Sequence, residues 1–293
     1  MEFIVPIEVA KARFPDFEFV EALTPSAQKA AFHVRRSGKD YCLKIIAPTQ
    51  TLERVQREVL AMQALDHPNI VKVVEYEYSV KDGEASHYIV EEFIAGDDLS
   101  AHMTPGRGWS IDKIVEIFGP LCDGLAALEA AKIVHRDLKP SNVRIRSDNS
   151  PVIVDFGLAR VLDMSSITAT VDGAMFGTPR YFAPEQLRGT KHDIDHRTDL
   201  YALGVLIYEA AVGHHPTLRK SVQTFSELFD AICNCKSYLE DKTFKLLPQR
   251  LQLLVGRLLE KERAKRPNNA VIVGKILREL GGADASRGLA PVW

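Results

Sequence analysis

Hydrophobic positions follow two different spacings along the chain. In the first third, short apolar runs separated by turn residues predict strands, because successive side chains of a strand point to opposite faces. Further on, apolar residues recur at the spacing of one helix face and predict long amphipathic helices. Strands are predicted at 17–20, 31–34, 41–46, 71–78, 87–93, 143–145 and 152–154, and helices at 51–65, 111–131, 198–213, 222–234, 246–260 and 268–280. Strands followed by helices indicate an α+β fold.

Two turns separate the first three predicted strands, and they differ in glycine content. Residues 37–40, Ser-Gly-Lys-Asp, have the composition of a hairpin turn. Residues 24–29, Thr-Pro-Ser-Ala-Gln-Lys, contain no glycine. The backbone of a turn comes closest to a phosphate where glycine leaves out the Cβ atom. The sequence therefore leaves open whether the turn at 24–29 holds one.

Composition and charge limit the functions open to the chain. Its 293 residues, 46% hydrophobic and 26% charged, are typical of a globular protein. Since 37 Lys and Arg are matched by 39 Asp and Glu, no overall field recruits nucleic acid or anionic lipid, and any phosphate recognition is local. The first residues lack the bases of a signal peptide, and no apolar run approaches the ~20 residues of a membrane helix. We expect a cytoplasmic protein without a nucleic-acid or membrane partner.

The cysteines and the loop histidines do not indicate a metal site. The four cysteines are too few and too irregularly placed for a disulfide framework, and Cys233 and Cys235 lack the second ligand pair of a zinc site. His192, His214 and His215 lie in polar loops without a ligand set. We expect reduced thiols and surface histidines.

The stretch that carries most chemical information is residues 133–142, Ile-Val-His-Arg-Asp-Leu-Lys-Pro-Ser-Asn. Several charged or ionisable groups and an amide between an apolar helix and an apolar strand make a poor core, so they need a chemical reason. The next apolar strand leads into Asp155, Phe156 and Gly157. Asn142 and Asp155 could hold Mg²⁺ through oxygen ligands and leave Asp137 to orient a hydroxyl. The pattern indicates phosphoryl transfer.

Together with Ala183-Pro184-Glu185, these motifs resemble those of the eukaryotic-type Ser/Thr protein kinase family over about residues 17–280. The resemblance implies a two-lobed α+β fold with ATP between the lobes and a hinge at about 92–95. The small lobe, 1–94, would hold a five-stranded antiparallel sheet and one helix. The large lobe, 95–281, would be mainly helical, and 282–293 would form a tail.

The resemblance also assigns the groups that perform the transfer. Lys44 would bind the α- and β-phosphates and pair with Glu58, although a lone strand lysine is otherwise a solvated edge residue. Asp137 would accept the hydroxyl proton, and Lys139 would neutralise the transferring phosphoryl group. The implied residues are Asp137, Lys139 and Asn142 for catalysis, Asn142 and Asp155 for the metal, and Lys44, Glu58, Leu23, Ala31, Cys42, Glu92 and Arg144 for the nucleotide.

The turn at residues 24–29 departs from the family pattern. Thr24, Ser26 and Lys29 stand where the family's nucleotide-covering turn has glycine. Their side chains limit the approach of backbone N–H groups, and Pro25 removes one donor. We expect weaker phosphate cradling than in the family at large. Lys29 could compensate with its charge or face solvent.

Three further departures surround the position that the resemblance gives to the base. Ala31 replaces a valine, Cys42 an alanine, and Arg144 an apolar floor residue. The stem of Arg144 could pack below the base while its guanidinium seeks an acid, for which Glu91 is a candidate. Either side chain could instead point to solvent.

Markers of the large lobe favour a polypeptide substrate. The resemblance implies that Glu185 pairs with a buried Arg266 and that Asp199 accepts backbone N–H groups of the catalytic loop. Thr178 would line the site of the acceptor hydroxyl. Lys139 indicates serine or threonine acceptors rather than tyrosine.

The segment 155–185 resembles the activation segment of the family. Arg136, beside the catalytic aspartate, is the family's mark of regulation by phosphorylation of this segment. Thr168 and Thr170 resemble the pair modified in many bacterial members. Without the resemblance, the segment is a solvated loop rich in hydroxyl residues.

Two hypotheses of different classes remain. The first is a Ser/Thr protein kinase that uses ATP and Mg²⁺, acts on protein substrates including its own activation segment, and receives signals through that segment or a regulatory partner. The second is a pseudokinase, a nucleotide-binding or scaffolding module. All the groups that perform the transfer are present, which favours the first hypothesis, since missing glycines mainly change affinity. A third alternative is phosphorylation of a small molecule or transfer of another group from the nucleotide.

Overall fold

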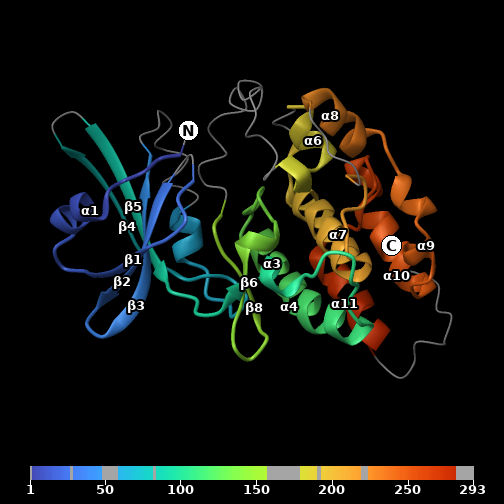
Figure 1. Cartoon of the computed structure of the whole chain (residues 1–293), viewed down its shortest axis with the longest axis horizontal. Coiled ribbons are helices and arrows are strands. Elements are labelled where there is room, and N and C mark those ends of the chain that lie inside the picture. The colour runs from blue at the N-terminus through green and yellow to red at the C-terminus, as the bar shows by residue number, and fades with distance from the viewer. Residues whose placement is uncertain are drawn as a thin grey trace. The chain divides into compact units, whose positions relative to one another are not determined.

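The computed structural model of the chain describes residues 2–26, 29–47, 59–81, 84–156, 179–189, 193–218 and 224–281. These residues form two compact units that divide between Ile94 and Ala95. The first unit carries the long strands and the second carries most of the helices (Figure 1). The α+β class expected from the sequence is confirmed.

A five-stranded antiparallel sheet forms the body of the first unit. The strands are β1 (Glu18–Ala22), β2 (Lys29–Arg36), β3 (Lys39–Ile46), β4 (Val73–Lys81) and β5 (Glu84–Glu92), in the order β1-β2-β3-β5-β4. Ser37 and Gly38 join β2 to β3 with φ angles of 51° and 73°. Two positive φ angles give a hairpin turn whose twist matches that of the strands. The hairpin turn predicted at residues 37–40 is confirmed.

The strand register divides the side chains of the sheet between two faces. Ala31 lies opposite Lys44, and Cys42 lies opposite Glu91. Directly opposed residues project from the same face, and so do residues two positions apart along a strand. These four side chains therefore share one face, whereas intervening residues such as Leu43 project from the other.

The second face of the sheet carries the hydrophobic core of the first unit. Helix α1 (Ile7–Arg13) packs there with Ala10 fully buried. Phe14 meets Tyr88 edge to face, with ring centroids 4.8 Å apart. The buried core residues are Ala10, Phe14, Phe17, Ala30, Phe32, Val34, Leu43, Ile45 and Val90. The hydrophobic pattern did not predict α1, because its seven residues are too few to show a helical period and depend on packing for their stability.

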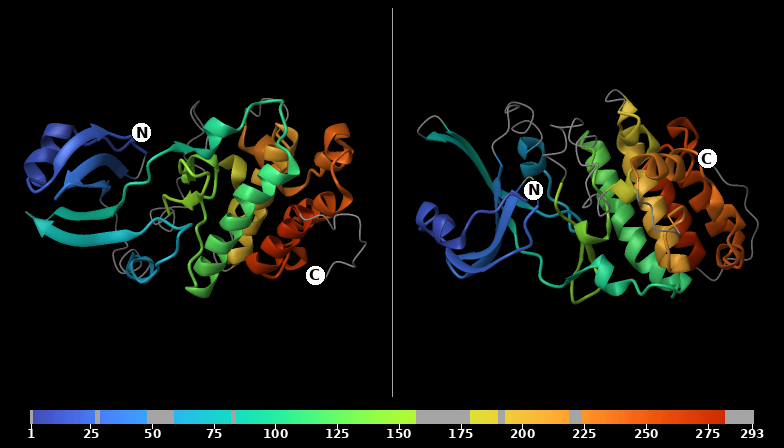
Figure 2. Two further views of the ribbon diagram at one scale, coloured as in Figure 1. Left: turned by 90° about the horizontal axis from the view of Figure 1, so that it is seen from below. Right: turned by 45° about the horizontal axis from the view of Figure 1, so that its top comes forward.

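Four long helices pack against one another in the second unit (Figure 2). They are α4 (Ile111–Ala130), α7 (His196–Val212), α10 (Gln249–Leu258) and α11 (Ala270–Gly281). Helix α4 packs along α11 and against α7, and α7 packs against α10. The approach of α4 to α11 is so close that a Cβ added to Gly274 would lie 3.0 Å from Cβ of Cys122. These helices lie where the apolar spacing predicts them.

Shorter elements connect these helices. A small sheet of order β6-β7-β8 lies beside the loop at residues 133–142, which is called the catalytic loop below because the resemblance assigns catalysis to it. The shorter elements are β6 (Asp97–Asp98), α3 (Leu99–His102), η1 (Pro140–Asn142), β7 (Val143–Ile145), β8 (Pro151–Ile153), η3 (Pro179–Tyr181), α6 (Pro184–Leu187), α8 (Phe225–Cys233), η5 (Ser237–Glu240), α9 (Lys242–Lys245) and η6 (Arg263–Lys265). Of the helix predicted at 51–65, residues 59–63 are helical, and residues 51–58 lie outside the described part.

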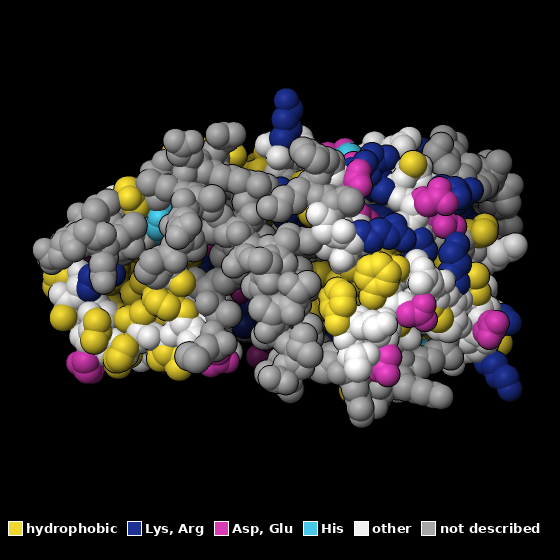
Figure 3. All heavy atoms as spheres, turned by 90° about the horizontal axis from the view of Figure 1, so that it is seen from above, with side chains coloured by type: hydrophobic (Ala, Val, Ile, Leu, Met, Phe, Trp, Pro, Cys, Tyr) yellow, Lys and Arg dark blue, Asp and Glu magenta, His cyan; other side chains and the backbone are white. Residues whose placement is uncertain are grey.

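The surface of the second unit carries both signs of charge. On the face drawn in Figure 3, its basic and acidic side chains lie interspersed with hydrophobic ones. This mixture agrees with the near balance of charges in the sequence. Among the helices that the structure describes, none combines the length and the apolar character needed to cross a bilayer.

The four cysteines are free thiols, as expected, but the expectation of surface histidines is wrong for His215. This residue is 3% exposed. Its Nε2 lies 2.9 Å from the carbonyl oxygen of Arg180, and its Nδ1 lies 3.1 Å from the backbone nitrogen of Leu218. Nε2 donates and Nδ1 accepts, which is the arrangement of a neutral ring. His214 has 39% of its side chain exposed, and His192 lies outside the described residues.

Acid should destabilise the fold through His215. Burial lowers the pKa of His215 to about 3, from 6.5 for the exposed side chain. Between these values the unfolded chain binds one more proton than the folded chain. The free energy of unfolding therefore falls as the pH falls from 6.5, with a limiting slope of about 1.4 kcal/mol per pH unit. Urea unfolding between about pH 7.5 and about pH 5 should show a shallower slope for His215→Gln than for the wild type. Equal slopes would contradict this assignment.

Candidate active site

A buried carboxylate holds the loop that follows α4. Asp199, in the first turn of α7, is 3% exposed. Its Oδ2 accepts the backbone N–H of His135 and its Oδ1 that of Arg136, each at 2.8 Å. Burial raises the pKa of Asp199, and the two donors oppose that rise. Arg136 has a φ angle of 64°, which residues other than glycine seldom adopt. The expected bracing role of Asp199 is confirmed.

Two side chains of this loop meet at the carboxylate of Asp137. Its Oδ2 lies 3.1 Å from Nζ of Lys139 and 3.1 Å from Nδ2 of Asn142. The Asn142 amide also donates to the backbone carbonyl of Asp137 at 2.8 Å. Two donors on one oxygen fix the orientation of the carboxylate. The structure therefore brings together the three residues to which the resemblance assigns catalysis.

Asn142 and Asp155 lie at the open end of the β7–β8 pair. Val143 lies opposite Ile153, and the N–H of Val154 then donates to the carbonyl of Asn142 at 2.9 Å. Asp155 follows directly along the chain. The hydrogen bonds of the Asn142 side chain use Nδ2, which leaves its amide oxygen for a cation. An amide oxygen and a carboxylate fit Mg²⁺, which proteins bind through few side chains together with substrate phosphates.

A metal site made of protein ligands alone is not found in the described ranges. No group of three or more His, Cys, Asp or Glu side chains there could hold an ion.

His135 is a core residue that connects the catalytic loop to the end of β8. It is fully buried. Its Nδ1 accepts the N–H of Asp137 at 3.2 Å, and its Nε2 donates to the carbonyl of Val154 at 3.0 Å. Its ring lies 5.0 Å from that of Phe156. Both ring nitrogens are engaged, so His135 positions neighbouring backbone and does not act as a base.

Lys44 is buried in the first unit and forms an ion pair with Glu91. Lys44 is 5% exposed and Glu91 is 3% exposed. Ala31 lies directly opposite Lys44, and its carbonyl accepts the N–H of Leu23 at 2.8 Å. Glu58, the partner that the resemblance implies for Lys44, lies outside the described residues. The pairing of Lys44 with Glu58 therefore stays a prediction.

Arg144 and Glu91, considered from the sequence as partners of each other, each contact a different residue. Within the second unit, the half-buried Arg144 donates from its guanidinium to the backbone carbonyl of Gly96. Within the first unit, Glu91 pairs with Lys44. The sequence offered Glu91 only as a candidate acid for the guanidinium of Arg144, and it gave no sign of either contact.

The end of β5 is fastened to the segment before β4. Glu92 donates its N–H to the carbonyl of Lys72 at 3.0 Å, and its carboxylate accepts the N–H of Lys72 at 3.0 Å. The role of Glu92 in nucleotide binding stays a prediction.

In the turn between β1 and β2, the structure describes the residues up to Ser26 and those from Lys29 onward. The N–H of Ser26 donates to the carbonyl of Lys29 at 2.9 Å, which joins the backbone on the two sides of the turn. The carbonyl of Ser26 accepts the N–H of Phe3 at 2.8 Å, which ties this turn to the N-terminal segment. Ala27 and Gln28 lie outside the described residues. Whether the turn holds a phosphate stays a prediction.

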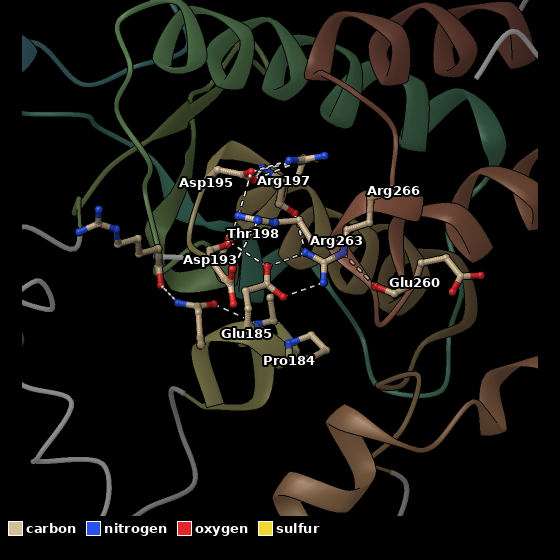
Figure 4. Close-up of polar contacts among 12 residues, drawn as sticks. Pro184, Glu185, Asp193, Asp195, Arg197, Thr198, Glu260, Arg263 and Arg266 are labelled. Atoms are coloured by element: carbon tan, nitrogen blue, oxygen red, sulfur yellow. Dashed lines mark hydrogen bonds and ion pairs between the residues drawn. The ribbon is translucent and has the colours of Figure 1, made fainter. Parts of the chain in front are cut away.

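A polar network braces the second unit (Figure 4). Nη1 of Arg266 donates to Oε1 of Glu185 at 2.7 Å, and Nη2 donates to Oε2 at 2.8 Å, so this expected pair is confirmed. The hydroxyl of Thr198 donates to the same Oε1 at 2.9 Å. Gln186 donates to the carbonyl of Arg136 at 2.8 Å and so links α6 to the catalytic loop. Sequence reasoning missed Gln186, although its place directly after the Ala-Pro-Glu motif was a signal.

Most of the activation segment falls outside the description. Residues 157–178 are not described. Thr168, Thr170 and Thr178 belong to that range, so their roles stay predictions. The described chain resumes at η3, where the hydroxyl of Tyr181 donates to Glu209 at 2.8 Å.

Comparison with protein-family models matches residues 28–276 to the protein kinase domain. The match covers most of the chain and agrees with the five-stranded sheet, the catalytic loop and the braced helices described above. The chain belongs to the protein kinase domain family.

Several curated bacterial proteins are similar to the chain. The probable serine/threonine-protein kinase PknB of Lactococcus lactis is 35% identical over 165 residues, which cover 56% of this chain and 25% of that protein. The serine/threonine-protein kinase pkn3 of Myxococcus xanthus is 35% identical over 180 residues, with coverages of 59% and 32%. The kinase pkn2 of the same organism is 32% identical over 246 residues, with coverages of 80% and 28%. The chain thus spans about a quarter to a third of the length of these relatives.

Proposed function

We propose that the chain transfers the γ-phosphoryl group of ATP, with Mg²⁺, to serine or threonine hydroxyls of proteins. The observation that carries this proposal is the meeting of Lys139 and Asn142 at one carboxylate oxygen of Asp137, beside the strand end that presents Asp155. Family membership supports it, and so do the names of the relatives, which are all serine/threonine-protein kinases.

The catalytic loop supplies the groups that act on the acceptor and the transferring group. Asp137 orients the acceptor hydroxyl and takes up its proton while the hydroxyl oxygen bonds to the γ-phosphorus. The bond from that phosphorus to the β–γ bridging oxygen breaks, and ADP leaves. The two donors on its Oδ2 keep the carboxylate from rotating. The ammonium group of Lys139 stabilises the negative charge on the phosphoryl group while that group is transferred. Mg²⁺, which Asn142 and Asp155 would hold, supplies further neutralisation of the phosphate oxygens when bound.

We take residues 1–94 as the nucleotide-binding small lobe and residues 95–281 as the catalytic large lobe. Lys44 of the small lobe is assigned to the α- and β-phosphates of ATP, and its place opposite Ala31 puts it on the face that carries other assigned nucleotide residues. The turn at residues 24–29 has no glycine, so we expect ATP to bind more weakly than in family members that have glycines there.

Regulation by phosphorylation forms part of the proposal. Thr168 and Thr170 are the candidate sites, and a phosphate on either adds nearly two negative charges that a cation can bind. Arg136 is the cation that we assign to this role. A regulatory partner could act on the same segment.

Phosphotransfer by the purified chain tests the proposal. With γ-labelled ATP, Mg²⁺ and generic protein acceptors, mass spectrometry should locate phosphate on serine and threonine. The label should disappear when Mg²⁺ is chelated and decrease strongly in Lys44→Met. Nucleotide binding without transfer to any acceptor would instead indicate a binding or scaffolding module. Label found on tyrosine or on a small molecule would overturn the proposed class of substrate.

A further inference from the structure

A buried carboxylate lies beside the lysine that is assigned to nucleotide phosphate. Nζ of Lys44 and Oε2 of Glu91 form an ion pair, with 6% and 4% of the two side chains exposed. On the sheet, Lys44 lies opposite Ile89 and Cys42 lies opposite Glu91. Lys44 and Glu91 are therefore diagonal neighbours on one face of β3 and β5.

The architecture of the sheet keeps this carboxylate in place. Strand β5 pairs with β3 on one side and with β4 on the other. The backbone at Glu91 cannot move away from Lys44 without breaking hydrogen bonds to both neighbours. The side chain can leave only by rotating within a closely packed environment. A phosphate that binds Lys44 therefore encounters the charge of Glu91.

Because the pair is buried, the interaction between the Glu91 carboxylate and a phosphate at Lys44 is strong. Charges interact more strongly at a buried site than in water, because the effective dielectric constant is lower. A phosphate and the carboxylate repel each other, and both are attracted to the same ammonium group. The carboxylate thus reduces the net attraction that Lys44 offers to a phosphate.

We propose that Glu91 sets the nucleotide affinity of this kinase by competing with phosphate for Lys44. The inference rests on the proposed function, in which Lys44 binds the α- and β-phosphates of ATP. Glu91 holds Lys44 when nucleotide is absent, and ATP binds by drawing the ammonium group away from the carboxylate. Adenosine has no phosphate, so its affinity does not depend on this competition.

Glu91→Gln isolates the charge from the shape. Glutamine keeps the size and an acceptor oxygen but removes the negative charge. The dissociation constant of ATP, measured by calorimetry on the whole chain, should fall about fivefold or more, as for a coupling between two sites. That of adenosine should not change. Glu91→Met is the second variant and should shift ATP in the same direction. In each variant, ATP should also raise the unfolding temperature more than in the wild type.

Glu77→Gln is the matched control. Glu77 lies on β4 of the same sheet and accepts a hydrogen bond from Tyr88, which packs against the core on the opposite face. The control removes the same charge from an exposed position, where solvent and salt screen it, so ATP affinity should stay within about twofold of the wild type. An equal gain in this control would overturn the inference.

Lys44→Met separates the inference from the proposed function. If Lys44→Met leaves ATP affinity unchanged, Lys44 does not bind phosphate, and the proposed role of Lys44 fails together with the inference. If Lys44→Met weakens ATP binding but Glu91→Gln fails to strengthen it, only the role of Glu91 is overturned. In the Lys44→Met background, Glu91→Gln should strengthen ATP binding less than it does in the wild type, because only the direct repulsion between carboxylate and phosphate then remains.

Discussion

Replacing Asp137 with asparagine should lower the rate of phosphoryl transfer by about 10²–10⁴-fold. Asparagine has the same shape, and its amide oxygen can still accept hydrogen bonds from Lys139 and Asn142, which meet at this position. An amide oxygen is too weak a base to take up the proton of the acceptor hydroxyl. The initial rate of label transfer to a serine or threonine acceptor at saturating ATP measures the loss.

Two controls separate a loss of chemistry from a loss of structure. ATP affinity in Asp137→Asn should stay close to that of the wild type, because Lys44 belongs to the other unit. Asp148→Asn removes an exposed carboxylate of the β7–β8 turn, which accepts the hydroxyl hydrogen bond of Ser150 at 2.6 Å, and should keep the wild-type rate. A rate above about a tenth of the wild type in Asp137→Asn would contradict the assignment of Asp137 as base.

The sequence predicted the helices and strands that are long enough for their spacing of apolar residues to repeat. Helix α4 shows several turns of apolar spacing, and the apolar runs of β3 and β5 mark buried strands. Helix α1 escaped prediction, because its single buried residue gives no period and the helix forms only where a sheet face offers apolar surface. The buried place of His215 also escaped, since polar neighbours in sequence do not reveal which part of the fold covers a loop.

The contacts of the candidate site also differ in how far they could be predicted: contacts within one loop follow from the sequence spacing, and contacts between distant strands do not. Asp137, Lys139 and Asn142 lie within one short loop, so their spacing alone restricted how far apart their side chains could lie. The contact of Lys44 with Glu91 depends on the register of two strands that are distant in sequence. Register follows from the turns and from the buried face together, and no single stretch of sequence contains it.

Arg266 occupies a fully enclosed position in the network that braces the second unit. Its side chain has no exposed surface, and that of Glu185 is 7% exposed. Besides the two bonds to Glu185, its Nε donates to the carbonyl of Glu260 and its Nη1 to that of Arg197, each at 2.9 Å (Figure 4). The guanidinium thus satisfies one buried carboxylate and two carbonyls. Lysine could not replace it, because an ammonium group lacks the planar fork that two carboxylate oxygens need.

Arg266→Met should lower the free energy of unfolding by about 3–5 kcal/mol, because it leaves the carboxylate of Glu185 buried without its partner. Urea unfolding measures the change. The control is Arg197→Met, which removes a partly exposed arginine from Asp195 and should cost at most about 1 kcal/mol, since Arg263 also pairs with that carboxylate. If the stranded charge causes the loss, Glu185→Met combined with Arg266→Met should regain part of it. A double variant less stable than Arg266→Met would show that lost packing dominates instead.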